Sequence, residues 1–238
     1  MVLPARVSLL GLAVAAVFAS PLQPRELAVD EVVLLNHNGT TRIMKAADLE
    51  ALETPAAAPA PASFPVHNVT TTPGMVRRGC EKSTEVQVLS DEHFVDWDVP
   101  MSPLVSSGGG NTTVSIMDGF QLSDRLKISA HTAVSSRKAL RVSTVPAFDM
   151  TWTTTQTNTL RFTLPPNKYG LVVSQPYVRR VQGNVLSGCT DNPDRNPFES
   201  DTYESQTFGG LSWVKGIIRM CTSETYPVPY CIGDGSHA

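Results

Sequence analysis

One stretch near the middle of the chain, FDMTWTTTQTNTLRFTL at residues 148–164, alternates between two kinds of side chain. Its even positions are apolar at both ends and polar in the middle, whereas its odd positions are nearly all threonine. Threonine favours extended backbone because its branched Cβ restricts χ1, and its hydroxyl tolerates water. The pattern therefore predicts β-strand with one solvated face, which is also a candidate binding surface. The threonines of this face are Thr151, Thr153, Thr155, Thr157 and Thr159.

The same stretch is far longer than a typical strand of ~5–6 residues. Either the chain bends near Gln156, or one long strand belongs to an elongated sheet. The rest of residues 79–238 also shows period-two segments, and helical periodicity is nearly absent there. Examples are residues 85–89, 112–117 and 126–134. We therefore predict an all-β fold, either a β-sandwich or an elongated antiparallel sheet.

The first residues, MVLPARVSLLGLAVAAVFAS, have the three parts of a secretory signal peptide. Arg6 supplies the positive charge, an apolar run follows, and Val17-Phe18-Ala19 matches the cleavage pattern. The apolar run is shorter than the ~20 residues that a membrane-spanning helix needs. We therefore expect residues 1–19 to be removed and the protein to be secreted to the extracellular space.

Secretion affects how the four cysteines are interpreted, because an oxidising compartment favours disulfides. Four cysteines allow three pairings. Cys221 and Cys231 flank a short proline-containing segment that suits a turned loop, so we favour this pair together with Cys80–Cys189. The cysteine and histidine spacings do not match zinc ligation, and we expect neither a metal nor another cofactor.

Residues 20–53 show the pattern of a small pro-region. Residues 31–35 predict a short strand, Asn-His-Asn-Gly at 36–39 a turn, and residues 40–44 a return strand. Residues 45–53 predict a short helix, because Ala and Leu recur at helical spacing. A unit of this size cannot hold a hydrophobic core alone.

Residues 54–78 are predicted to be a linker. They begin with TPAAAPAPASF, whose alternating Ala and Pro favour extended, solvated backbone, and they end in Arg77-Arg78. The dibasic pair resembles a processing site for a kexin-type protease, and the alternative is a linker that merely contains two arginines. Cleavage would leave residues 79–238, a disulfide-stapled β-rich domain. A second pair, Arg179-Arg180, lies in an expected strand, where folding should protect it.

Three N-glycosylation sequons begin at Asn38, Asn68 and Asn111. The third follows the loop SSGGG in the β-rich part, and we expect it to be accessible there. If the chain is cut after Arg78, Asn111 begins the only sequon that remains in the mature protein.

Catalytic motifs are missing from the sequence, which has no phosphate-binding glycine loop, Gly-x-Ser-x-Gly or His-Glu-x-x-His. We predict no catalytic residue, and the five histidines are scattered singly. One acidic cluster, DEHFVDWDVP at residues 91–100, suggests cation binding or a carboxylate pair for glycoside cleavage. The alternative, which we favour, is a structural segment whose aromatic residues turn inward while its charges face water. A net charge of −3 gives no indication of nucleic-acid binding.

Several segments of the chain look familiar together: RRGCEKSTEVQVLS, KYGLVVSQPYVRRVQGNVLSGCTD, LSWVKGIIRMC, YPVPYCIGDGSHA and the leader VVLLNHNGTTRIMKAADLEAL. They resemble a family of filamentous-fungal secreted proteins described as effector-like, and the leader is similar to that family's pro-region. The resemblance implies an exported fungal protein with a β-rich fold and a role in virulence. It implies no catalytic residue, because the family is defined by secretion and not by chemistry.

A second similarity is architectural, since long Ser/Thr-rich amphipathic strands resemble those of aerolysin-like pore-forming toxins. Such a strand must offer about ten alternating residues to span a bilayer, and residues 126–134 and 148–164 could supply two. Our leading expectation is a protein that binds an unknown molecule at a host or cell surface. The alternative is a membrane-active, pore-forming protein, and an enzyme acting on cell-wall polysaccharide comes third.

Overall fold

The computed structural model describes residues 25–53, 80, 82–128, 150–154 and 160–238, which excludes the predicted signal peptide and the whole of the predicted linker. The described residues lie mostly in β-strands and include one short helix, so the all-β prediction is confirmed. The N-terminal segment contains β1 (Arg25–Leu27), β2 (Glu31–Leu35), β3 (Thr41–Lys45) and α1 (Ala46–Glu53).

The remaining elements are all strands. They are β4 (Lys82–Val95), β5 (Val99–Pro100), β6 (Val105–Ser106), β7 (Thr112–Ser115), β8 (Gln121–Ser123), β9 (Arg125–Ile128), β10 (Thr151–Thr153), β11 (Leu160–Leu164), β12 (Tyr169–Cys189), β13 (Asp194–Tyr203), β14 (Ser205–Phe208), β15 (Leu211–Val214), β16 (Gly216–Ser223), β17 (Val228–Pro229) and β18 (Ser236–His237). Among all the described strands, β1 and β11 form the one parallel pair, and the other pairs are antiparallel.

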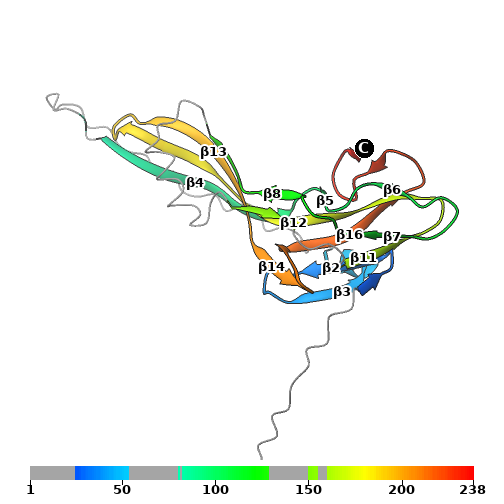
Figure 1. The fold of residues 1–238 in the computed structure, drawn as a ribbon. Helices are drawn as coiled ribbons and strands as arrows, with labels where there is room; N and C mark the ends of the chain where they lie inside the picture. Colours follow the sequence, from blue (N-terminus) through cyan, green and yellow to red (C-terminus); the bar gives the residue numbers. More distant parts are fainter. Residues whose placement is uncertain (1–24, 54–79, 81, 129–149, 155–159) are drawn as a thin grey trace, which may run out of the picture.

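Strand β12 organises the molecule because its two halves pair with different partners. Residues 169–176 pair with β16 on one edge, and the short strands β5 and β6 pair with the other edge. Residues 177–189 lie between β4 and β13, and β9 continues the sheet beyond β13. In Figure 1 the second half of β12 extends with β4 and β13 as an arm, away from a body that contains β2, β3, β7, β11 and β16. Of the two predicted architectures, the elongated antiparallel sheet therefore describes the arm.

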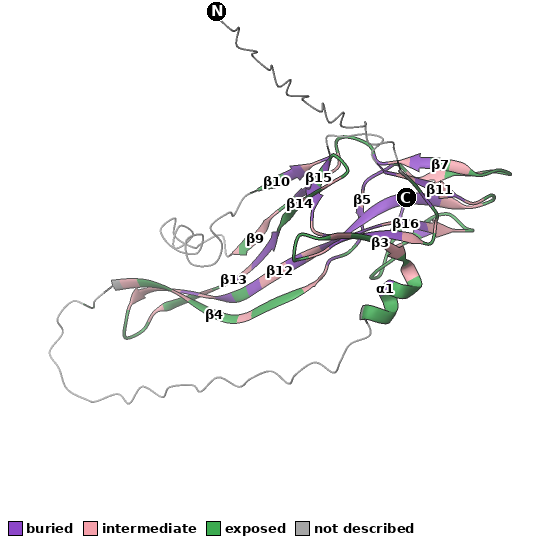
Figure 2. Cartoon of the chain, turned by 90° about the horizontal axis from the view of Figure 1, so that it is seen from below, coloured by how far each residue is buried: buried purple, intermediate pink, exposed green. Residues whose placement is uncertain are grey.

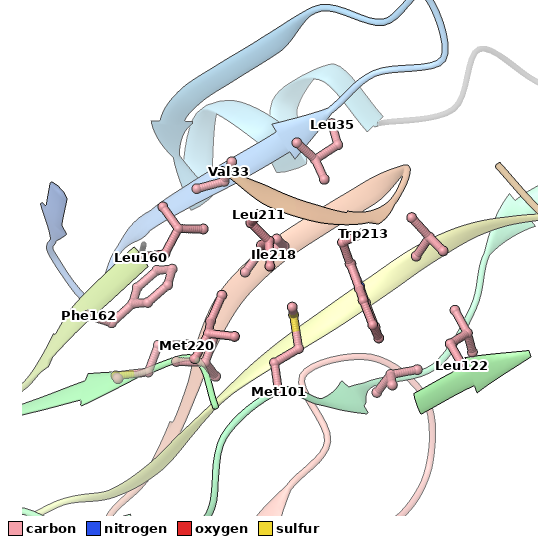
Figure 3. Packing of buried hydrophobic residues seen from close by; sticks show 14 of the residues in the cluster. Val33, Leu35, Met101, Leu122, Leu160, Phe162, Leu211, Trp213, Ile218 and Met220 are labelled. Atoms are coloured by element: carbon pink, nitrogen blue, oxygen red, sulfur yellow. The ribbon is translucent and has the colours of Figure 1, made fainter. Parts of the chain in front are cut away.

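The body encloses the largest hydrophobic core, which Figure 3 shows from close by. Trp213 of β15 is fully buried there, and its indole Nε1 donates a hydrogen bond to the Ser174 hydroxyl at 2.9 Å. This bond satisfies the one polar atom of the side chain, so the ring can be buried without an unpaired donor. Met101, Ile218 and Met220 lie around it in the same cluster.

The N-terminal segment is an integral layer of the body. Strand β2 lies between β3 and β16, and both of its faces are covered. Val33 and Leu35 enter the main core, whereas Val32 and Leu34 pack on the opposite face against Leu49 of α1. The outer side of α1 is exposed (Figure 2). The segment that looks like a separate unit in the sequence therefore shares its core with the residues after position 80.

The threonine-rich stretch is divided between two sheets. Strand β10 pairs with β8, whereas β11 pairs with β1 and β7. The option of one continuous strand over residues 148–164 is therefore wrong, and the residues between the two strands, 155–159, lie outside the described residues. The predicted alternation holds within each piece, because Trp152, Phe162 and Leu164 are buried while Thr151 is exposed.

The arm is thin and has its own small core. Val181, Val185 and Phe198 are buried, with Val86, Leu126 and Ile128 packed against them. Gly183 sits at a register shift between β12 and β4, where a Cβ atom would lie 2.1 Å from the carbonyl oxygen of Gln87. The position accepts only glycine because the neighbouring backbone occupies that space. The Cys80–Cys189 disulfide closes the far end of the arm.

Candidate functional site

The acidic stretch at residues 91–100 does not bring its carboxylates into one site. Asp91 forms a bidentate pair with Arg179 on the surface of the arm, with nitrogen–oxygen distances of 2.6 and 2.8 Å. Asp96 is buried and accepts a hydrogen bond of 2.8 Å from the Tyr203 hydroxyl. Asp98 is buried in a different cluster of hydrogen bonds. Each of these three aspartates therefore has its own structural partner.

The expectation that the aromatic residues of this stretch turn inward while its charges face water is wrong for three residues. Trp97 is 51% exposed, with the Arg125 guanidinium 4.9 Å from its ring centroid, whereas Asp96 and Asp98 are each 4% exposed. The reason is the availability of partners: the two carboxylates meet donors inside the molecule, and the indole meets a surface cation. No feature of the local sequence shows those partners.

Asp98 belongs to the one group of potential metal ligands found among the described residues. Its carboxylate accepts a hydrogen bond from the Gln175 amide at 2.7 Å and another from the backbone N–H of Cys231, and it lies 3.3 Å from His237 Nε2. The third potential ligand is Cys221, but its sulfur is bonded to Cys231 and cannot act as a thiolate. The group therefore does not fit a metal ion, and it anchors the C-terminal loop instead.

The other residues singled out from the sequence are dispersed. The disulfides join Cys80 to Cys189 and Cys221 to Cys231, which is the favoured pairing. Asn38 and Asn111 are exposed, Thr151 is exposed and Thr153 is half-buried. The rest lie outside the described residues: Asn68, Arg77, Arg78, Thr155, Thr157 and Thr159. The proposed threonine face therefore does not form a described surface.

A cavity of about 170 Å³ lies where β12 passes from the body sheet into the arm. Its walls come from the turn after β2, the end of β4, the residue between β8 and β9, the middle of β12, the end of β13 with the residue after it, and the residue before β16. The lining residues are His37, His93, Asp124, Tyr177, Val178, Arg179, Thr202, Tyr203, Glu204 and Lys215. We call this cavity the junction pocket.

Aromatic rings form one side of the junction pocket. The imidazole of His37 stacks on the ring of Tyr177, with centroids 4.4 Å apart, and meets His93 edge to face at 6.2 Å. The Asn-His-Asn-Gly turn holds His37 there, because Gly39 takes a positive φ of 79° that closes the turn. Among the described residues, neither imidazole forms a hydrogen bond. Their ring nitrogens can therefore bond to a ligand.

Charged residues of the junction pocket form ion pairs. The Lys215 ammonium binds the Glu204 carboxylate and donates a hydrogen bond to the His37 carbonyl oxygen at 2.7 Å. The hydrogen bond from Lys215 lowers the pKa of Glu204, and the hydrogen bond from Arg179 lowers the pKa of Asp91. Both carboxylates therefore stay charged at neutral pH and hold their basic partners in place.

Tyr203 lies at the back of the junction pocket as a neutral phenol. Burial raises its pKa, and the hydrogen bond to Asp96 raises it further. The hydroxyl group is therefore a fixed donor and not a general base. No described residue of the pocket forms a nucleophile–base pair, so the arrangement suits binding better than covalent chemistry.

The sequence did not reveal the junction pocket. Its histidines were interpreted as isolated, because His37 and His93 lie far apart in the chain and come together only when β2 joins the body sheet. The predicted turn at residues 36–39 was a usable signal for where His37 lies, but not for what it meets. No helix among the described residues is both long and apolar enough to cross a membrane. No protein-family model, curated protein or solved structure matches this chain.

Proposed function

We propose that this is a secreted, fungal effector-like protein that binds a molecule at a host or cell surface through the junction pocket. The observation that carries the proposal is the pair of imidazoles, His37 and His93, which line the cavity and have no hydrogen-bond partner among the described residues. Two disulfides are consistent with an extracellular protein.

The size and lining of the cavity indicate the kind of ligand. At about 170 Å³ it is smaller than the ~300–1,000 Å³ of typical small-molecule sites. It therefore suits one sugar unit or one polar side chain of a larger molecule. A hydroxyl of that group can donate to or accept from an imidazole nitrogen, whereas a carboxylate can only accept from an imidazole N–H.

The test uses protein with isotope-labelled histidine, titrated with a panel of methyl glycosides and of N-acetylated amino-acid amides. We expect saturable shifts of the His37 and His93 imidazole signals with at least one probe. The variant His93→Ala should weaken that binding by at least ~10-fold, and Ser212→Ala, an exposed change on β15, should leave it unchanged. Binding that is unaffected by His93→Ala, or no shift with any probe, would refute the proposal.

A membrane-active function is the second candidate, and the elongated arm is the observation that favours it. Within the described residues, however, β9 and β10 are shorter than the ~9–11 residues that a spanning strand needs, and they pair in separate sheets, so a pore would require these strands to rearrange. Lys127 of β9 and Glu199 of β13 lie directly opposite each other. Replacing both with cysteine should allow a disulfide that prevents β9 from leaving the sheet.

Liposome leakage tests this second candidate. If the protein forms pores, the Lys127→Cys/Glu199→Cys variant should release dye from anionic vesicles only after reduction, whereas each single cysteine variant should release dye throughout. Absence of leakage by the unmodified protein rules the candidate out. Leakage that persists in the oxidised double variant shows that this part of the arm does not rearrange.

A further inference from the structure

Residues 25–53 contact the rest of the protein near both ends of the segment, although the predicted processing site lies between them and residue 80. At the start of the segment, β1 runs parallel to β11 and places Leu27 in the body core, where it is 1% exposed. The Thr163 hydroxyl donates a hydrogen bond of 2.6 Å to the Glu26 carboxylate. At the end of the segment, Leu49 of α1 belongs to a buried hydrophobic cluster that also contains Ile217 of β16.

Strand β2 forms the centre of this attachment. It pairs with β16 from Val33 to Leu35, and its residues 32–35 are all buried. A strand buried on both faces contributes to two cores at once, and its removal would open both. It would also leave β16 with an unpaired edge beside Ile217 and Ile218, which is a site for aggregation.

Polar side chains of β14 and of the residue before β16 hold the turn after β2. The Gln206 amide donates to the carbonyl oxygens of Gly39 and Thr40, at 3.1 and 3.2 Å, and lies 2.9 Å from the Thr41 hydroxyl. Lys215 binds the carbonyl oxygen of His37. These contacts use backbone atoms, so they fix the position of the turn and with it one wall of the junction pocket.

No covalent bond other than the chain itself holds this segment, because the cysteines lie at positions 80 to 231 and pair with one another. We propose that residues 25–53 stay bound as a separate peptide after the chain is cut between residues 53 and 80. The processed protein is then a non-covalent complex of two chains. The peptide supplies His37, so the junction pocket is complete only while the peptide remains. This last point rests on the proposed function, whereas the two-chain state does not.

The experiment uses the full secreted chain with the recognition sequence of a site-specific protease in place of residues 56–62. After complete cleavage, gel filtration at ~10 µM protein is combined with mass spectrometry of the eluted peak. We expect at least nine tenths of the peptide to co-elute with the larger chain, which corresponds to a Kd on the order of 0.1 µM or tighter. Elution of the peptide as a separate species overturns the proposal, whether the larger chain stays folded or aggregates.

A second measurement tests the contacts that hold the turn. Exchange of the bound peptide against a fluorescent copy of residues 25–53 gives its dissociation rate. Gln206→Ala should raise this rate by about 5–10-fold, because the carbonyl oxygens of Gly39 and Thr40 then lose their hydrogen-bond donor in the larger chain. Thr207→Ala, an exposed change on the same strand, should stay within about twofold of the unmodified protein. Equal dissociation rates for both variants would show that Gln206 does not contribute to holding the peptide. Neither readout involves a ligand, so failure here is distinct from failure of the binding function.

Discussion

At the scale of single residues, Asp98 shows how a buried carboxylate can be structural. The Gln175 amide and the backbone N–H of Cys231 both donate to it inside the molecule. Asp98→Ala should lower the free energy of unfolding by about 2–5 kcal/mol, because it leaves the buried Gln175 amide and the part-buried Cys231 N–H without their acceptor. Asp118→Ala removes an exposed carboxylate and should change it by less than about 0.5 kcal/mol. Urea unfolding of both variants measures the difference, and equal midpoints would contradict a structural role for Asp98.

The neighbours Thr151 and Trp152 test the strand alternation at the same scale. Trp152 is buried and meets Tyr203 edge to face, with ring centroids 5.9 Å apart, whereas Thr151 points to solvent. Trp152→Ala should cost about 3–5 kcal/mol of unfolding free energy, as expected for a large buried aromatic residue. Thr151→Lys should cost less than about 0.5 kcal/mol. Similar losses for both variants in thermal unfolding would show that β10 is not buried on one face only.

At the scale of elements, the sequence predicted those features that are local. Residues 31–53 follow the predicted order of strand, turn, strand and helix, because alternation, an Asn-Gly turn and helical spacing all act over a few residues. The apolar run Val32–Leu35 is also typical of a strand covered on both faces. Its partner β16 lies more than 180 residues later by the numbering, so no local pattern identified it. The division of residues 148–164 between two sheets depends equally on distant partners.

Gly183 allows a prediction about the arm as an element. It lies at the register shift between β12 and β4, and an added Cβ would meet the Gln87 carbonyl oxygen at 2.1 Å and the Phe198 ring at 2.8 Å. Gly183→Ala should therefore force the strands apart and cost about 1–3 kcal/mol, as overpacking does. Gly110 has open space around it, so Gly110→Ala should have little effect. Amide hydrogen exchange should show loss of protection confined to β4, β12 and β13 in the first variant. Unchanged protection there would contradict the described register.

At the scale of the whole molecule, β12 connects the arm to the body, and the junction pocket lies where its partners change. The residues around that point come from six separate parts of the chain, so the pocket exists only when arm, body and N-terminal segment are assembled together. Ion pairs make the assembly sensitive to pH. Four described carboxylates have lowered pKa values, each bound to a basic side chain: Asp30, Asp91, Glu199 and Glu204. Glu204 and Arg179, the partner of Asp91, line the junction pocket.

The direction of the pH effect follows from those lowered pKa values. A carboxyl group whose pKa is lower in the folded protein than in the unfolded chain stabilises the fold above its unfolded pKa, and this stabilisation disappears as the pH falls through the folded pKa. We therefore expect stability to be nearly constant from pH 7 to about 5 and to decrease below about 4.5. Protonation of Glu204 would also weaken its hold on Lys215, which fixes the turn that carries His37.

Thermal unfolding between pH 3 and pH 7 measures this effect, with Glu204→Gln as the matched variant. The variant should be slightly less stable than the unmodified protein at pH 7. The two should converge at the acidic end of the range, as the pH falls through the lowered pKa of Glu204 and its side chain becomes neutral like that of Gln. The Glu204 side chain is 67% accessible, so the difference should be small and should shrink in high salt. A difference that stays constant across this pH range would show that charge on Glu204 does not contribute to the fold.

Cleaved protein should lose its N-terminal peptide more readily at the acidic end, because the same pair helps to hold the turn of that peptide.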